Sequence, residues 1–294
     1  MRTASDRIVA ADGLKLPTRA WLPDDDAPRA GVVLVHGLGE HVGRYDGLAT
    51  RMVRAGYAVH GYDQRGHGYA QGHRAQVRRF EDLIGDLAQF VATVRAWHPE
   101  APLVLFGHSM GGVVAIRALQ TDAVRADLLV LSSPALRDGN DVPAWVRALV
   151  ARLAEPFPSL PTVRLDVTAL SRDPAEVEAY RQDPAVFHGA IKARLGTQLS
   201  KHGALALEEA ERLHVPTLIV HGKDDRIARP GASGELHRAL QGGDASLELY
   251  DEGPHELFHD PLRDRVTEDV LVWLDARLPA APVSPVGRPE APRT

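Results

Sequence analysis

The chain has 294 residues, 44% of them hydrophobic and 25% charged, which is the usual composition of a globular protein with one large or two small domains. Its formal net charge of −5 gives no electrostatic reason to expect a nucleic-acid partner. The sequence contains no cysteine, which excludes thiol catalysis, disulfide bonds and thiolate metal sites.

The N-terminus predicts an antiparallel hairpin rather than a targeting segment. Residues 1–11 carry charges without an apolar core, so they do not form a secretory signal. Residues 8–10 and 14–21 flank Asp12-Gly13, which is a strong signal for a hairpin turn. No apolar run of the chain approaches the ~18 residues that a membrane span needs, and we expect a cytoplasmic protein.

Beyond the hairpin, short apolar runs bounded by turn residues alternate with segments of helical periodicity. In chain order they are strand 31–35, helix 45–55, strand 57–62, helix 80–97, strand 103–106, helix 112–119, strand 128–131, strand 217–220, helix 233–240, strand 247–250 and helix 263–278. This order is typical of an α/β protein with a mostly parallel central sheet flanked by helices, and the hairpin would form its antiparallel edge.

One long segment interrupts the alternation. Between residues 136 and 213 no strand pattern occurs, and the helical stretches are 144–154, 174–181, 190–199 and 205–213. We interpret 136–213 as a helical cap inserted after strand 128–131 into a core formed by residues 1–135 and 214–278; the alternative is an insertion packed elsewhere. Residues 279–294 are rich in proline and poor in large apolar groups, and we expect them to be disordered.

The most informative motif follows the strand at 103–106. Residues 107–111 read Gly-His-Ser-Met-Gly, a G-x-S-x-G sequence between a predicted strand and a predicted helix. Such a turn holds the serine hydroxyl at the end of a sheet and is too tight for side chains at Gly107 and Gly111. The motif is weak by itself, but its position between strand and helix favours Ser109 as a nucleophile.

A serine nucleophile needs a general base, and the base needs a group that orients it. On a sheet of this kind these groups follow later strands, in the chain order serine, acid, histidine. The loop after strand 217–220 contains Asp224 and Asp225, and the loop after strand 247–250 contains His255. The sequence therefore predicts a triad of Ser109, one of these two aspartates, and His255.

Acyl transfer also needs donors for the oxyanion of its intermediate. We expect one from the backbone N–H of Met110, the residue after the nucleophile, and one from the loop after strand 31–35, where Leu38 is the candidate. Both donors belong to the main chain, so the side chains at these positions are not critical. No cofactor and no metal ion is implied by this chemistry.

Several motifs together resemble those of serine hydrolases with the α/β-hydrolase fold, in the bacterial type of the monoacylglycerol lipase and lysophospholipase group. The matching segments are residues 36–41, 43–45, 62–68, 107–112, 222–226 and 253–255. The resemblance implies hydrolysis of lipid carboxylic esters, with monoacylglycerol as the first candidate and lysophospholipids or simple carboxylic esters as alternatives. Its G-x-x-D-R pattern favours Asp225 over Asp224 as the acid of the triad.

The resemblance also implies where a substrate would lie. Glu40 and Arg44 would sit near the pocket for the alcohol part; the alternative is that Glu40 caps the following helix or pairs with Arg44. The acyl chain would lie under the cap, near Leu149 and Leu153. The apolar cap residues that could line this path are at positions 145, 146, 149, 150, 153, 157, 160 and 163, and we expect most of them to pack onto the sheet. An exposed apolar rim on the cap would contact a membrane or micelle peripherally.

Two hypotheses from other functional classes remain, a zinc hydrolase and a non-catalytic ligand-binding protein. Residues 255–259 read His-Glu-Leu-Phe-His, a literal H-E-x-x-H, which binds zinc when a helix places both histidines on one face. Pro254 and Pro261 leave about one turn for such a helix, so a zinc hydrolase using His255 and His259 is a remote alternative. A non-catalytic ligand-binding protein is disfavoured because all candidates for the triad are present. Serine peptidases and thioesterases share the triad, and the sequence leaves the oligomeric state open.

Overall fold

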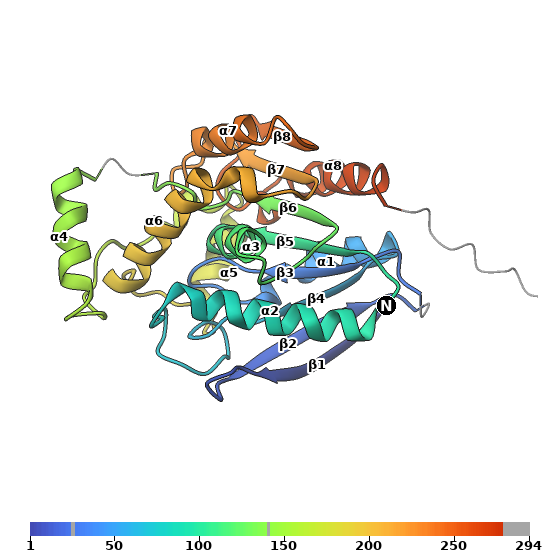
Figure 1. The fold of residues 1–294 in the computed structure, drawn as a ribbon, viewed down its shortest axis with the longest axis horizontal. Helices are drawn as coiled ribbons and strands as arrows, with labels where there is room; N and C mark the ends of the chain where they lie inside the picture. The colour runs from blue at the N-terminus through green and yellow to red at the C-terminus, as the bar shows by residue number, and fades with distance from the viewer. Residues whose placement is uncertain (25–26, 140–141, 279–294) are drawn as a thin grey trace, which may run out of the picture.

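The computed structural model describes residues 1–24, 27–139 and 142–278 of the chain. Its strands form one sheet with the order β1-β2-β4-β3-β5-β6-β7-β8 (Figure 1). The strands are β1 (Arg2–Val9), β2 (Lys15–Leu22), β3 (Gly31–Val35), β4 (Ala58–Tyr62), β5 (Leu103–His108), β6 (Leu128–Ser132), β7 (Thr217–Gly222) and β8 (Ala245–Tyr250). The hairpin β1–β2 joins β4 in antiparallel orientation, and the remaining pairs are parallel. The predicted mostly parallel sheet with an antiparallel edge is confirmed.

Helices cover both faces of this sheet (Figure 1). They are α1 (Asp46–Arg54), α2 (Phe80–Trp97), α3 (Met110–Gln120), α7 (Pro230–Ala239) and α8 (Arg263–Asp275). Successive side chains of a strand point to opposite faces. Accordingly, Val33 and Val35 of β3 join the core under α2 and α3, whereas Val32 and Leu34 join the core under α1 and α8.

β1 is longer than its sequence pattern indicated. It begins at Arg2, whereas the apolar run at 8–10 marks only its end. Seven of its eight side chains are exposed, because the strand lies at the edge of the sheet with little packed against it. An edge strand of this kind carries no apolar periodicity for the sequence to reveal.

The segment between β6 and β7 contains α4 (Ala144–Ala154), α5 (Pro174–Gln182) and α6 (Ala193–Glu208). The prediction of separate helices at 190–199 and 205–213 is wrong, because α6 is continuous and is followed only by a short 3₁₀ turn at Ala210–Arg212. Gly203 does not end a helix. It lies where α6 approaches the chain at Leu136, whose carbonyl oxygen would be 2.6 Å from a Cβ atom at position 203.

α4 lies beyond the edge of the sheet and packs against α6 (Figure 1). Large apolar side chains of α4 and the chain that follows it are exposed; they are Trp145, Leu149, Phe157, Leu160 and Val163. The expectation that most of these residues pack onto the sheet is therefore wrong, because α4 does not reach it. Leu153 is half-buried. The predicted disordered segment 279–294 lies outside the described residues. Within them, no helix combines the length and apolar character needed to cross a membrane.

Candidate active site

Ser109 sits on the turn between β5 and α3. Its backbone angles are φ 52° and ψ −118°, in a region that residues other than glycine rarely adopt. A Cβ atom at Gly107 would lie 2.7 Å from the carbonyl oxygen of Gly111, and one at Gly111 would overlap the carbonyl oxygen of Val35. The two glycines are thus required for the close approach of this turn to its neighbours, as their place in the motif predicted.

Ser109, His255 and Asp225 form a continuous chain of contacts. The Ser109 Oγ atom is 2.9 Å from Nε2 of His255, and the His255 Nδ1 atom is 2.7 Å from Oδ2 of Asp225. All three residues are buried. They come from the loops after β5, β8 and β7, which end at the same edge of the sheet. The aspartate that meets His255 is Asp225, whereas Asp224 is exposed.

The Asp225 carboxylate is held by four donors. Oδ1 accepts the backbone N–H groups of Ile227 and Ala228, at 2.8 and 2.9 Å. Oδ2 accepts from His255 and also from Nε2 of His221, 2.9 Å away. Burial raises the pKa of this carboxyl, but the charges and hydrogen bonds of His255 and His221 lower it by more than burial raises it. The pKa therefore lies below its ordinary value, and the carboxylate form is favoured. His221 was not predicted as a site residue, and the signal for it is its position at the end of β7, near Asp225.

The same contacts act on the base. Burial lowers the pKa of His255, but the charge and hydrogen bond of Asp225 raise it above the ordinary value. His108 lies beside it with ring centroids 5.0 Å apart, and burial lowers the pKa of His108 to about 4. The site therefore contains His255, whose pKa is raised, and next to it His108, whose lowered pKa keeps it neutral.

Leu38 and Met110 are the predicted backbone donors for the oxyanion, and both lie near Ser109 in the chain or in space. Met110 is the first residue of α3, and Leu38 lies in the loop after β3. Neither N–H group meets an acceptor among the residues that the structure describes. The loop that carries Leu38 lies directly against the nucleophile, because a Cβ atom at Gly37 would be 3.2 Å from the Cβ atom of Ser109.

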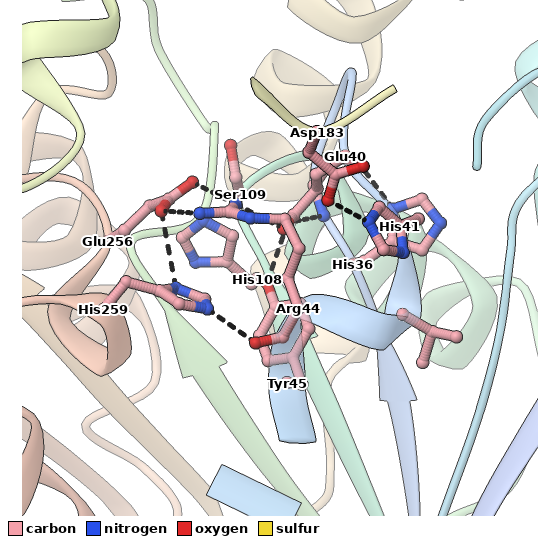
Figure 2. A network of polar contacts seen from close by, with 12 residues as sticks. His36, Glu40, His41, Arg44, Tyr45, His108, Ser109, Asp183, Glu256 and His259 are labelled. Carbon is pink, nitrogen blue, oxygen red and sulfur yellow. Dashed lines mark hydrogen bonds and ion pairs between the residues drawn. The ribbon is translucent and has the colours of Figure 1, made fainter. Parts of the chain in front are cut away.

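Glu40 and Arg44 belong to a buried ionic cluster (Figure 2). The Glu40 carboxylate accepts the N–H of Gly37 at 2.6 Å, the hydroxyl of Tyr45 at 2.8 Å and Nη1 of Arg44 at 2.9 Å. The Arg44 guanidinium also donates two bonds to Glu256, at 2.7 and 2.6 Å. Burial raises the pKa values of both carboxyls, but Arg44 between them holds both below their ordinary values.

This cluster distinguishes the two structural alternatives for Glu40, a helix cap and an ion pair with Arg44. Glu40 pairs with Arg44 and does not cap a helix, since the residue that caps the 3₁₀ turn Val42–Tyr45 is His41. The sequence pointed to Glu256 only as part of the H-E-x-x-H pattern. The signal for a role in the site was the position of this acidic residue directly after the candidate base His255.

The H-E-x-x-H segment is not an α-helix. Only a 3₁₀ turn forms, at Leu257–His259. His255 faces Ser109, whereas Nε2 of His259 is 2.9 Å from the carbonyl oxygen of Arg44. The two imidazoles therefore face different partners. Among the described residues, no group of three or more histidine and acidic side chains is arranged to hold a metal ion.

The segment between β6 and β7 contacts the loop after β3, which carries Leu38, and the loop after β8, which carries His255. The Phe187 N–H donates to the carbonyl oxygen of Gly39 at 2.7 Å, and the His41 Nε2 atom is 2.8 Å from Asp183 Oδ2. The Glu256 N–H donates to the carbonyl oxygen of Leu170 at 2.9 Å.

The geometry of the whole site fits nucleophilic acyl transfer. It combines a serine in contact with a base, an acid that orients this base, and unpaired backbone donors beside them.

Comparisons with known proteins agree with this geometry. A family model described as serine aminopeptidase, S33, matches residues 26–262, a range that contains every residue of the proposed triad. A monoacylglycerol lipase of Mycolicibacterium smegmatis is 35% identical over 271 residues, which cover 92% of this chain and 96% of the relative. A monoglyceride lipase of Rattus norvegicus is 33% identical, with 93% and 91% covered. The crystal structure of a monoacylglycerol lipase from Paleococcus ferrophilus matches with a TM-score of 0.78 at 30% identity, covering 94% of this chain and all of the other.

Proposed function

Since the chain belongs to the serine aminopeptidase S33 family and is an α/β-hydrolase, we propose that it hydrolyses monoacylglycerols to a free fatty acid and glycerol. The observation that carries the proposal is the contact chain from Ser109 through His255 to Asp225. The monoacylglycerol lipases it resembles match it over nearly their whole length. The enzyme class is thus that of a serine hydrolase acting on carboxylic esters.

In the proposed mechanism, Ser109 attacks the ester carbonyl while His255 takes the hydroxyl proton. Asp225 orients the imidazole and stabilises its protonated form. The N–H groups of Leu38 and Met110 hold the oxyanion, and His255 then gives its proton to the leaving alcohol. An acyl-enzyme remains on Ser109, and a water molecule activated by His255 releases the fatty acid.

The family description names an aminopeptidase, which makes amide hydrolysis the second candidate. An aminopeptidase needs an anionic group for the free ammonium of its substrate. The two carboxylates that flank the site, Glu40 and Glu256, are both engaged by Arg44. This pairing favours a neutral alcohol over a cationic amine and supports the ester.

We propose further that residues 136–213 form a cap over the site, with the acyl chain near Leu149 and Leu153. The alcohol would lie on the side of the site where Glu40 and Arg44 are found, without displacing the partners of their buried side chains. Exposed apolar side chains around α4 support peripheral contact of this cap with a membrane or micelle that holds the substrate. A cytoplasmic location stays a prediction.

A substrate panel on the purified protein tests the function. It compares monoacylglycerols, lysophosphatidylcholine, nitrophenyl esters of graded chain length and an aminoacyl amide, with Ser109→Ala as the control. We expect the highest kcat/KM for a monoacylglycerol and a loss of roughly 1,000-fold or more in the variant. A preference for the amide, or indifference to chain length, would contradict the assignment. If a chelator removes the activity and the Ser109→Ala variant keeps it, the result would instead favour the hypothesis of a zinc hydrolase.

A further inference from the structure

The cluster of Glu40, Arg44 and Glu256 joins two loops that the reaction needs (Figure 2). We call residues 36–41 the oxyanion loop and residues 253–260 the histidine loop. We propose that these three side chains are positioning residues, which fix the oxyanion loop relative to His255 in the histidine loop. The inference rests on the proposed function, because it concerns the geometry of acyl transfer.

The first half of the link is the bond from Glu40 to its own loop. The Glu40 carboxylate accepts the N–H of Gly37, at 2.6 Å, one residue before Leu38. A Cβ atom at Gly37 would lie 2.9 Å from this carboxylate and 3.2 Å from the Cβ atom of Ser109. Glu40 therefore holds the loop that carries Leu38 against the nucleophile.

The second half is the two-pronged bond from Arg44 to Glu256, the residue directly after His255. A guanidinium and a carboxylate that share two parallel bonds are fixed in direction as well as in distance. A second path also links the two loops. His259 contacts the carbonyl oxygen of Arg44 and lies edge-on to Tyr45, whose hydroxyl donates to Glu40.

The burial of the cluster favours positioning over binding of substrate. The side chains of Arg44, Glu40 and Glu256 are 8%, 3% and 5% exposed. The ring of Tyr180 from α5 covers the guanidinium, with its centroid 4.7 Å from the Arg44 Cζ atom. Each carboxylate already has partners within the protein, so a substrate hydroxyl would have to displace one of them.

The test measures kcat, KM and inhibition by an alkylboronic acid, which mimics the tetrahedral intermediate. Its variants are Glu40→Gln, Glu256→Gln and Arg44→Lys, the last of which keeps the charge but loses the two-pronged geometry. Rates are divided by the concentration of sites that a fluorophosphonate titrates. We expect kcat to fall roughly 10- to 100-fold, because complete loss of an oxyanion donor costs about 100-fold or more. KM should change less than about 3-fold, and boronic acid affinity should fall in parallel with kcat.

Asp86→Asn provides a matched control. Asp86 on α2 accepts two bonds from Arg65, at 2.6 and 2.7 Å, and is as deeply buried, but neither residue contacts the triad. This variant should lower the melting temperature and leave kcat per titrated site unchanged. Tyr45→Phe removes one hydrogen bond from Glu40 and serves if the charge variants do not fold; we expect a smaller loss of kcat, roughly 2- to 5-fold.

Two results would overturn the inference. In the first, the cluster variants lose stability while kcat per titrated site and boronic acid affinity stay at the wild-type values, as Asp86→Asn should do. In the second, only KM rises, which assigns the cluster to binding of the alcohol. Failure of the proposed function is a separate result, because it would show in the wild-type protein as a preference for the amide or as indifference to chain length.

Discussion

His221 contacts the same carboxylate oxygen of Asp225 that faces His255, at 2.9 Å from Nε2 of His221. On its other side, Nδ1 of His221 is 2.7 Å from the hydroxyl oxygen of Ser233 on α7. A carboxylate only accepts hydrogen bonds, so Nε2 of His221 donates to Asp225, and Nδ1 is left to accept from the Ser233 hydroxyl. The acid of the proposed triad is thereby tied to the helix after β7.

His221→Leu should therefore impair catalysis through Asp225. We expect kcat to fall roughly 10-fold with little change in KM, because the carboxylate loses one donor and gains freedom to turn away from His255. The free energy of unfolding should fall by about 1 to 3 kcal/mol, since the Ser233 hydroxyl loses its buried acceptor. Steady-state kinetics and urea unfolding measure the two effects. His221→Gln, which keeps a donor, should recover part of kcat; equal losses in both variants would argue against this role.

Asp225→Asn should change the pH dependence of kcat/KM as well as its size. The proposed base must be neutral to act, so activity is lost as pH falls through the pKa of His255, which Asp225 raises above its ordinary value despite burial. Removing the negative charge lowers that pKa and moves the acid limb of the profile to lower pH. We also expect kcat to fall roughly 10,000-fold, as replacement of a triad aspartate does in other hydrolases.

Asp224→Asn is the matched control for this change, because Asp224 is the exposed neighbour of Asp225. Its profile should coincide with that of the wild-type enzyme. An acid limb in Asp225→Asn that stays in place or moves to higher pH would contradict the electrostatic account.

Two glycines in helices should respond to alanine with opposite signs. At Gly203 of α6, a Cβ atom would lie 2.6 Å from the carbonyl oxygen of Leu136, whereas at Gly85 of α2 nothing lies within 4 Å. Alanine in an open helix position stabilises by roughly 0.5 to 1 kcal/mol. Overpacking against backbone costs about 1 to 3 kcal/mol. Gly85→Ala should raise the melting temperature and Gly203→Ala should lower it; the same sign for both would count against the close approach of α6.

The exposed apolar residues around α4 should govern adsorption to lipid. Trp145 is 71% exposed and Phe157 is 58% exposed. Replacing each with serine should weaken binding to phospholipid vesicles roughly 10-fold, because partial burial of a large apolar side chain gives on the order of 1 to 2 kcal/mol. Vesicle sedimentation measures the effect, and hydrolysis of a short soluble ester monitors folding. Val272→Ser on α8, 64% exposed but outside the inserted segment, is the control. Equal losses in all variants would exclude a specific surface.

The sequence was sufficient wherever a local pattern carries the structure. Apolar runs located the buried strands β3 to β7, because a strand covered on both faces has to be apolar along its length. The G-x-S-x-G motif located the turn at Ser109, because its steric requirements involve only residues close in the chain and their immediate neighbours. The extent of β1 was mispredicted because an exposed edge strand lacks apolar periodicity. The continuity of α6 was mispredicted because Gly203 is required by the close approach of Leu136, a residue distant in the chain, and not by a helix end.

Only the tertiary structure decided which charged groups meet. Nothing in the spacing of residues 44 and 256 shows that Arg44 and Glu256 share two hydrogen bonds, or that His221 and His255 share one oxygen of Asp225. Such pairs depend on the order in which strands join the sheet and on where each loop leaves its edge. Amino-acid patterns encode period and turn chemistry over a few residues, whereas these contacts form when distant loops are brought together by packing of the whole core.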